Sequence, residues 1–286
     1  MAKGISIHIG LNAVDPGHYG GWSGPLKGCE ADANSMAEIA QNQGFDPVHK
    51  LLTRHATSRA VLAALDDAAG KLQSGDILFL SNSSHGGQVP DTNNDETDDQ
   101  MDETWCLYDR ELIDDELYAR WHRFRPGVRI VVLSDSCHSG SVLRAVPRML
   151  KPEAVTSVVE GAPDDENELE GIMKAMREDR AMAVYQAHKD EYDRLQRDAG
   201  PSERADIGAT VILISGCQDN QTSADGAKNG LFTETLLKVW HEGKFKGGYR
   251  PFWRQIVRRM PMWQTPNFMR VGAQDADFLK QHPFTV

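Results

Sequence analysis

Two short segments of the sequence carry side chains that could act together as a nucleophile and a base. One is S-S-H-G-G at residues 83–87, and the other is D-S-C-H-S-G at residues 135–140. A thiol beside an imidazole becomes a nucleophile once the imidazole has taken its proton. We therefore predict that Cys137 and His85 act as a pair, and that the glycines after His85 let backbone approach a ligand closely.

The elements around these segments alternate between strands and helices. Short apolar runs predict strands, and apolar residues at helical spacing predict helices. Strands are predicted at 5–11, 48–52, 76–80, 129–133, 210–215 and 268–271, and helices at 30–43, after the N-cap Thr57, and at 114–124, 231–240 and 251–260. This order predicts an α/β fold with a mostly parallel sheet and helices on both faces. A long loop is expected between the strand at 76–80 and the helix at 114–124.

The two chemistry-bearing segments fall at one edge of this predicted sheet. Ligand sites in such sheets lie beyond the carboxyl ends of the strands. Residues 81–88 follow one buried strand and residues 134–141 follow another. The sheet therefore brings His85 and Cys137 together although they are 52 positions apart in the chain.

The net charge of −11 comes from one region. Residues 91–116 hold twelve carboxylates and a single cation, Arg110, whereas the remaining residues balance. A basic face for nucleic acid and a polybasic membrane anchor are both missing, so neither partner is expected. No apolar run approaches the roughly 20 residues that span a bilayer. A secretory cleavage site is also missing, which favours a cytoplasmic location.

The four cysteines do not form a disulfide or zinc pattern. Cys29, Cys106, Cys137 and Cys217 are widely separated, with no C-x-x-C pair. We expect Cys106 and Cys217 to be buried structural thiols. A G-x-S-x-G elbow is absent, so an α/β hydrolase is not expected.

Six motifs in order along the chain resemble those of the metacaspases and their bacterial relatives, in the caspase-like clan of cysteine peptidases. The separation of His85 and Cys137 is also close to the roughly 50 residues between the caspase pair. The matching segments are G-C-E-A-D-A at 28–33, S-S-H-G-G-Q at 83–88, I-D-D-E-L at 113–117, D-S-C-H-S-G at 135–140, S-G-C-Q-D-N-Q-T-S-A at 215–224 and Q-T-P-N at 264–267.

This resemblance implies a caspase-like three-layer sandwich and a cysteine endopeptidase. Cys137 would be the nucleophile, and His85 the general base and acid. The backbone N–H groups of Gly86 and Cys137 would hold the oxyanion of the tetrahedral intermediate. No organic cofactor is implied. The alternative is a caspase-fold signalling or scaffolding module whose cleft is idle.

The resemblance also implies which substrates would be cut. In the family, the residue before the scissile bond is Arg or Lys. The matching pocket residues are Cys29, Asp32, Ser83 and Asp135. Two carboxylates in one pocket would complement a cation and repel an acidic side chain. Protein or peptide substrates with Arg or Lys at this position are therefore expected.

The acidic loop has two interpretations that stay open. The resemblance implies a calcium site formed by Asp98 or Asp99 together with Asp114 and Asp115. A further family aspartate is replaced by Arg144, a cation that would oppose a divalent ion. The other interpretation is a solvated acidic loop without a metal.

We expect residues 1–286 to form a single caspase-like peptidase domain, with an insertion or mobile excursion at 150–205. This stretch is charged and contains prolines, with a helical pattern around 173–195. A protease cleft could accept an exposed chain there, and ten cations between Arg144 and Arg204 would suit a basic-specific pocket. Self-processing in this window is one hypothesis. A solvated helix packed on the body through its methionines is the other.

Overall fold

A six-stranded sheet forms the centre of the computed structural model, which describes residues 2–93, 100–136, 172–200, 206–218, 221 and 223–286. The strand order is β2-β1-β3-β7-β8-β9. All neighbours are parallel except β9, which runs antiparallel to β8 at the sheet edge. The bounds are β1 (Gly4–Gly10), β2 (Val48–Leu52), β3 (Ile77–Ser83), β7 (Arg129–Asp135), β8 (Thr210–Ser215) and β9 (Asn267–Gly272).

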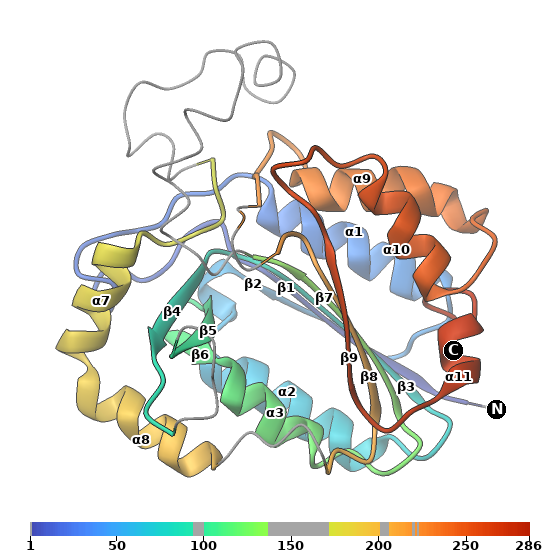
Figure 1. Cartoon of the computed structure of the whole chain (residues 1–286), viewed down its shortest axis with the longest axis horizontal. Coiled ribbons are helices and arrows are strands. Elements are labelled where there is room, and N and C mark those ends of the chain that lie inside the picture. The colour runs from blue at the N-terminus through green and yellow to red at the C-terminus, as the bar shows by residue number, and fades with distance from the viewer. Residues whose placement is uncertain (1, 94–99, 137–171, 201–205, 219–220, 222) are drawn as a thin grey trace.

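Helices cover both faces of this sheet (Figure 1). On one face lie α1 (Cys29–Asn42), α9 (Leu231–Trp240) and α10 (Tyr249–Val257), with α11 (Ala276–Lys280) beside them. On the other face lie α2 (Ser58–Lys71) and α3 (Asp114–Trp121). The predicted α/β three-layer sandwich is therefore confirmed.

The strands form a sheet with two apolar faces because their side chains alternate between two cores. In β7, Ile130 and Val132 pack in the core under α2 and α3, whereas Val131 and Leu133 pack in the core under α1 and α9. Burial on both faces explains why these strands are nearly continuous apolar runs in the sequence. The predicted N-cap is also confirmed, because Thr57 Oγ1 accepts a hydrogen bond from the Ala60 backbone N–H at 3.2 Å.

The prediction of a long loop after β3 is wrong in part. A second, antiparallel sheet occupies this region, with the order β4-β5-β6 and the bounds β4 (Gly86–Pro90), β5 (Met101–Cys106) and β6 (Glu111–Ile113). Acidic residues such as Asp102 and Glu111 are buried in these strands. They interrupt the alternation of apolar and polar residues that would have predicted strands from the sequence.

The described part of the predicted excursion is packed on the body. It contains α7 (Glu178–Ala187) and α8 (Lys189–Ala199), whose Tyr185 and Tyr192 are buried. Gln196 anchors α8 by donating from Nε2 to the Pro90 carbonyl at 2.9 Å. Residues 150–171 and 201–205 lie outside the described residues, so the single-domain prediction with an excursion at 150–205 stays a prediction.

One acidic residue of the small sheet is an unusual core group. Glu111 is fully buried, and its Oε2 accepts a hydrogen bond from Thr104 Oγ1 at 2.5 Å. Its Oε1 has no hydrogen-bond partner among the described residues. Burial raises the pKa of Glu111 to about 8, although the Thr104 bond opposes the shift. The carboxyl group is therefore protonated in the folded chain at neutral pH.

We predict that Glu111→Gln removes a pH-dependent instability. The pKa of Glu111 is higher in the folded chain than in the unfolded chain, so its contribution to stability is complete below about pH 4.5 and is lost as pH rises through 8. Between these values the unfolding free energy should fall by up to about 1.4 kcal/mol per pH unit. Urea unfolding at pH 5, 7 and 9 measures this. The variant should gain stability over the wild type only at the higher pH values.

Exposed Glu242→Gln is the matched control for this measurement, because Glu242 projects into solvent at the surface. If the unfolding free energy of Glu111→Gln changed with pH in parallel with that of the wild type, the raised pKa of Glu111 would be contradicted.

Candidate active site

The carboxyl ends of two neighbouring strands, β3 and β7, and the amino-terminal ends of two helices, α1 and α9, meet at one place. Ser83 ends β3, and Asp135 ends β7 directly opposite it in the parallel register. Asp32 lies in the first turn of α1, and Gly230 is the N-cap of α9. His85 follows β3 by two residues. The topology therefore brings together residues that are far apart in the sequence, as the strand order predicted.

His85 is held as a neutral imidazole in a buried position. Its Nε2 is 3.3 Å from the Gly24 carbonyl oxygen, and the Trp22 ring lies at 4.7 Å between centroids. Burial lowers the pKa of His85 to about 3, although the Gly24 carbonyl opposes the shift. Donation from Nε2–H to Gly24 would leave the lone pair on Nδ1, which has no hydrogen-bond partner among the described residues. The imidazole is therefore neutral and buried close to the carboxyl end of β3.

The predicted nucleophile, Cys137, lies outside the described residues. The chain is well fixed immediately before it, because buried Ser136 Oγ is 2.9 Å from Ser134 Oγ. Ser134 Oγ also accepts a hydrogen bond from Trp105 Nε1 at 3.0 Å. Gly86, whose N–H was predicted to hold an oxyanion, donates that N–H to a carbonyl oxygen of the chain itself, that of Lys174, at 3.0 Å.

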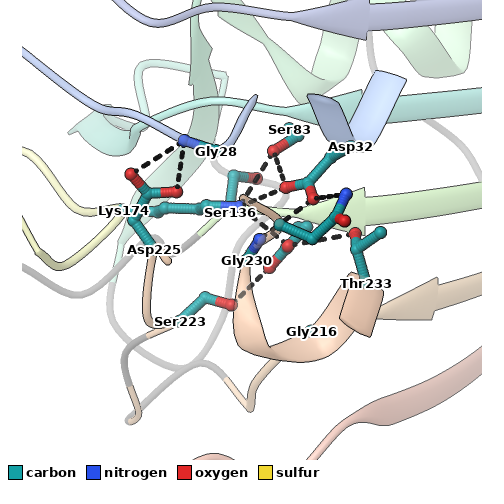
Figure 2. Close-up of polar contacts among 12 residues, drawn as sticks. Gly28, Asp32, Ser83, Ser136, Lys174, Gly216, Ser223, Asp225, Gly230 and Thr233 are labelled. Carbon is teal, nitrogen blue, oxygen red and sulfur yellow. Dashed lines mark hydrogen bonds and ion pairs between the residues drawn. The ribbon is translucent and has the colours of Figure 1, made fainter. Parts of the chain in front are cut away.

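The predicted specificity pocket is filled by a lysine of the same chain. Lys174 Nζ lies 2.8 Å from Asp32 Oδ2, 2.8 Å from Asp135 Oδ2 and 2.9 Å from Ser83 Oγ. Figure 2 shows the Lys174 side chain reaching toward Asp32 and Ser83. Lys174 has no solvent exposure. The three polar residues predicted for this pocket, Asp32, Ser83 and Asp135, therefore do bind one ammonium group together.

The ammonium group is held in its charged form. Burial by itself would lower the pKa of Lys174, but the adjacent Asp135 and Asp32 carboxylates raise it well above the ordinary value. A buried cation with two carboxylates has the complementarity that an Arg or Lys side chain requires.

Further hydrogen-bond donors hold the carboxylates of Asp32 and Asp135 in place. Asp32 Oδ1 accepts hydrogen bonds from the Gly230 N–H and from Asn229 Nδ2, each at 2.9 Å. Asp135 Oδ1 accepts one from Ser223 Oγ at 2.5 Å, and Ser223 Oγ in turn accepts one from Gln264 Nε2 at 2.6 Å. The family motifs at 215–224 and 264–267 contain two of these residues. Sequence reasoning assigned them no role.

Three of the four cysteines lie in the described part of the chain, and all three are buried. Cys106 and Cys217 are buried, as predicted for structural residues. Cys29 is also buried and lies near Ser83, and burial raises the pKa of its thiol. A neutral thiol is a poor nucleophile.

The predicted calcium ligands are only partly within the described chain. Asp98 and Asp99 lie outside it. Asp114 and Asp115 begin α3, where carboxylates are stabilised by the helix dipole. Asp115 Oδ2 accepts a hydrogen bond from Asn93 Nδ2 at 2.9 Å.

Within the described ranges, the one group of three metal-ligating side chains is elsewhere, at His18, His188 and Glu191. The rings of His18 and His188 are stacked 4.0 Å apart at an interplanar angle of 12°. Stacked parallel rings cannot both direct a nitrogen lone pair at one ion, so this cluster fits packing better than metal binding.

The sandwich and the carboxylate-lined pocket beside a buried histidine define a caspase-like protein. A family model described as the caspase domain matches residues 13–276. The chain therefore belongs to the caspase-domain family, and the resemblance to metacaspases is confirmed. In the described part of the chain, no helix is long and apolar enough to cross a membrane.

Individual relatives agree with this assignment. The chain is 29% identical to Metacaspase-1 of Schizosaccharomyces pombe over 268 residues, which cover 85% of this chain and 60% of that protein. It is 31% identical to Metacaspase-1 of Coccidioides immitis over 253 residues, 82% of this chain and 53% of that protein. The chain thus spans little more than half the length of these relatives.

Solved structures are similar as well. Protein GSU0716 from Geobacter sulfurreducens has a TM-score of 0.86 at 51% identity, with 99% of each chain covered. Caspase-1 from Spodoptera frugiperda has a TM-score of 0.54 at 10% identity, covering 96% of this chain and 92% of that one, and supports the fold alone.

We predict that Gly230→Ala lowers the free energy of unfolding because the added methyl group clashes with the pocket residues, and not because of the backbone conformation. Gly230 has a φ of −59°, which alanine adopts without strain. An added Cβ would lie 2.7 Å from Asp135 Oδ2 and even closer to Lys174 Nζ. Overpacking of this kind costs about 1–3 kcal/mol. Urea unfolding measures the loss.

Gly70→Ala in α2 is the matched control, because a Cβ there meets no atom within 4 Å. It should leave stability unchanged or raise it by about 0.5–1 kcal/mol. Equal unfolding free energies for Gly230→Ala and the wild type would contradict the tight pocket.

Proposed function

We propose that the chain is a cysteine endopeptidase that cleaves after Arg or Lys. The observation that carries this proposal is the buried ammonium group of Lys174 between Asp32 and Asp135, next to His85. A pocket that binds a basic side chain beside a neutral imidazole base is what hydrolysis after a basic residue requires. The ordered motifs around His85 and Cys137 supply the reacting groups.

The chemistry would proceed through a covalent intermediate. His85 Nδ1 takes the proton of Cys137, and the thiolate attacks the carbonyl carbon of the scissile bond. The N–H groups of Gly86 and Cys137 stabilise the oxyanion. His85 then protonates the leaving amine, and water hydrolyses the thioester. The reaction needs no organic cofactor.

Specificity would come from charge. An Arg or Lys side chain entering the pocket can donate to Asp32, Asp135 and Ser83, as the Lys174 ammonium does. An aspartate would place a third carboxylate in a buried site, where it would be neither solvated nor paired. Cys29 would form part of the wall.

Calcium binding to the acidic loop is a further part of this proposal. Asp114 and Asp115 present carboxylate oxygens, the ligands that calcium prefers, and Asp98 and Asp99 would complete the set. Calcium would relieve the repulsion within the acidic region, and these residues would act by positioning the loop rather than in the chemical steps.

We predict that Cys137→Ala and His85→Ala each lower kcat for an Arg peptide by about 10³-fold or more, because residues that act as a unit lose comparable activity when either is removed. A fluorogenic peptide assay measures turnover, and circular dichroism checks the fold. Exposed His55→Ala is the matched control and should keep full activity.

Substantial turnover by Cys137→Ala would end this assignment. If the wild type neither turned over basic peptides nor reacted with a thiol-reactive peptide inhibitor, the idle signalling or scaffolding module would be favoured instead.

We predict that Asp135→Asn lowers kcat/KM for Arg and Lys peptides by about 10²-fold, since loss of one buried partner of a cation costs about 3 kcal/mol or more. A peptide panel that varies the residue before the scissile bond measures this, run with calcium and with chelator. The wild type should cleave after Arg and Lys but not after Asp.

A wild-type preference for Asp peptides would contradict the basic pocket. Equal activity in calcium and in chelator would remove the calcium proposal and leave the specificity proposal unaffected.

A further inference from the structure

One stretch of the chain is strongly basic and contains no acidic residue. Residues 243–274 have no Asp or Glu but seven cations, so the charges outside the acidic region at 91–116 balance in total and yet are separated along the chain. The seven cations are Lys244, Lys246, Arg250, Arg254, Arg258, Arg259 and Arg270. Four of them are arginines of α10 or of the two residues that follow it. The sequence therefore places a concentration of positive charge at this helix.

Three of these arginines form a row along the exposed side of α10, which lies next to α9 and α11 (Figure 1). Arg250, Arg254 and Arg258, which we name the arginine row, recur at every fourth residue, and Arg258 keeps helical dihedral angles of φ −63° and ψ −18°. On the opposite side of the helix, Phe252 and Ile256 are buried in the core under α1 and α9. At a rise of about 1.5 Å per residue, neighbouring members of the row are about 6 Å apart along the helix axis.

The arginine row is not balanced by the helix that carries it. Cations four residues apart on a helix repel each other, and Arg250 lies in the first turn, where the helix dipole disfavours positive charge. Other helices pair their cations with carboxylates at this spacing, in Lys71–Asp67, Lys189–Asp193 and Lys238–Glu234. No member of the row forms an ion pair with a carboxylate of the described residues. The row therefore destabilises α10 without compensation from that part of the chain.

The guanidinium groups of the row are available to a partner. Within the described ranges, the side chains of Arg254 and Arg258 form no hydrogen bond. The Arg250 guanidinium lies over the Phe268 ring of β9, 5.1 Å from its centroid, a contact that fixes its position without providing an acceptor for its N–H groups. The adjacent Arg259 differs, because its Nη1 donates to the Gln255 carbonyl at 3.0 Å.

The arginine row ends close to the candidate active site. Gln264 follows Arg258 by six residues, a length of chain that spans at most about 20 Å. Gln264 Nε2 donates to Ser223 Oγ at 2.6 Å, and Ser223 in turn donates to Asp135 in the pocket. A chain bound along the row would therefore be directed toward the pocket.

We propose that the arginine row is a docking surface for an acidic, extended segment of a protein substrate. The role in substrate recruitment rests on the proposed peptidase function. Alternate side chains of an extended chain lie on the same side about 6.6 Å apart, which is close to the spacing of the row. Asp or Glu at every second position can thus each meet one guanidinium group, which binds a carboxylate through two parallel hydrogen bonds.

A short acidic segment fits the row better than a nucleic acid or a lipid surface does. The row is only about 12 Å long, which matches three alternate side chains of a five-residue segment. A duplex or a membrane would extend far beyond it. The chain as a whole carries a net charge of −11, which repels a large polyanion outside the row.

Fluorescence anisotropy with labelled five-residue peptides tests the docking surface at low ionic strength, where surface charges act most strongly. The peptides contain no Arg or Lys, so the proposed peptidase cannot cut them. The wild type should bind Asp-Thr-Asp-Thr-Asp more tightly than Asp-Asp-Asp-Thr-Thr, which has the same charge at another spacing, and should not bind Asn-Thr-Asn-Thr-Asn. Arg254→Gln/Arg258→Gln should weaken binding of the first peptide about tenfold, because two ion pairs are lost.

Lys238→Gln/Lys244→Gln is the matched control and should bind the peptides as the wild type does. It also removes two exposed charges, but these are already paired, with Glu234 at 2.6 Å and with Glu242 at 3.2 Å. Equal binding of the Asp and Asn peptides, no preference for alternate Asp, or equal weakening in both double variants would overturn the inference. Tighter binding of duplex DNA or of vesicles of phosphatidylserine and phosphatidylcholine, lost in Arg254→Gln/Arg258→Gln, would assign the row to that partner and overturn it as well.

Turnover shows whether docking serves the cleft. A fluorogenic peptide with Arg before the scissile bond, joined by a flexible linker to Asp-Thr-Asp-Thr-Asp, should have a lower KM in the wild type than the same peptide joined to the Asn segment. In Arg254→Gln/Arg258→Gln the two KM values should be equal. Equal values in the wild type would overturn the role in substrate recruitment. If no form hydrolysed Arg peptides, the proposed peptidase would fail, and the anisotropy measurement, which needs no turnover, would still decide whether the row binds acidic segments.

Discussion

The buried ionic group of Lys174, Asp32 and Asp135 is the interaction on which the rest of the site depends. Two carboxylates within bonding distance of one point repel each other strongly in a medium of low dielectric constant, so the pocket is stable only with a cation between them. The fold supplies the carboxylates from α1 and from the end of β7, and the cation from a segment almost 40 residues beyond β7. Removal of the ammonium group or of a carboxylate leaves an uncompensated buried charge.

The two carboxylates are also held by hydrogen-bond donors other than the lysine. The Gly230 N–H and Asn229 hold Asp32, while Ser223 and Gln264 hold Asp135 through a short chain of hydrogen bonds. Donors fixed on neighbouring helices and loops orient the carboxylates toward the ammonium group. The absence of a side chain at Gly230 leaves the space that the ammonium group fills. The geometry and the charge of the pocket therefore both fit the Lys174 side chain.

The sequence by itself determined the central sheet, the position of most of its helices and the meeting of Ser83 and Asp135 at one sheet edge. Apolar runs fix buried parallel strands, and the ends of such strands converge, so His85, Ser83 and Asp135 could be placed together from their positions alone. The small sheet of β4, β5 and β6 was missed because its buried acids, such as Glu111, break the alternation that marks a strand. Lys174 was one of ten cations in its window, and nothing local distinguishes it from Arg177. Only the tertiary structure decided which cation lies in the pocket, because that depends on where a distant segment crosses the sheet edge, a long-range contact that local sequence does not encode.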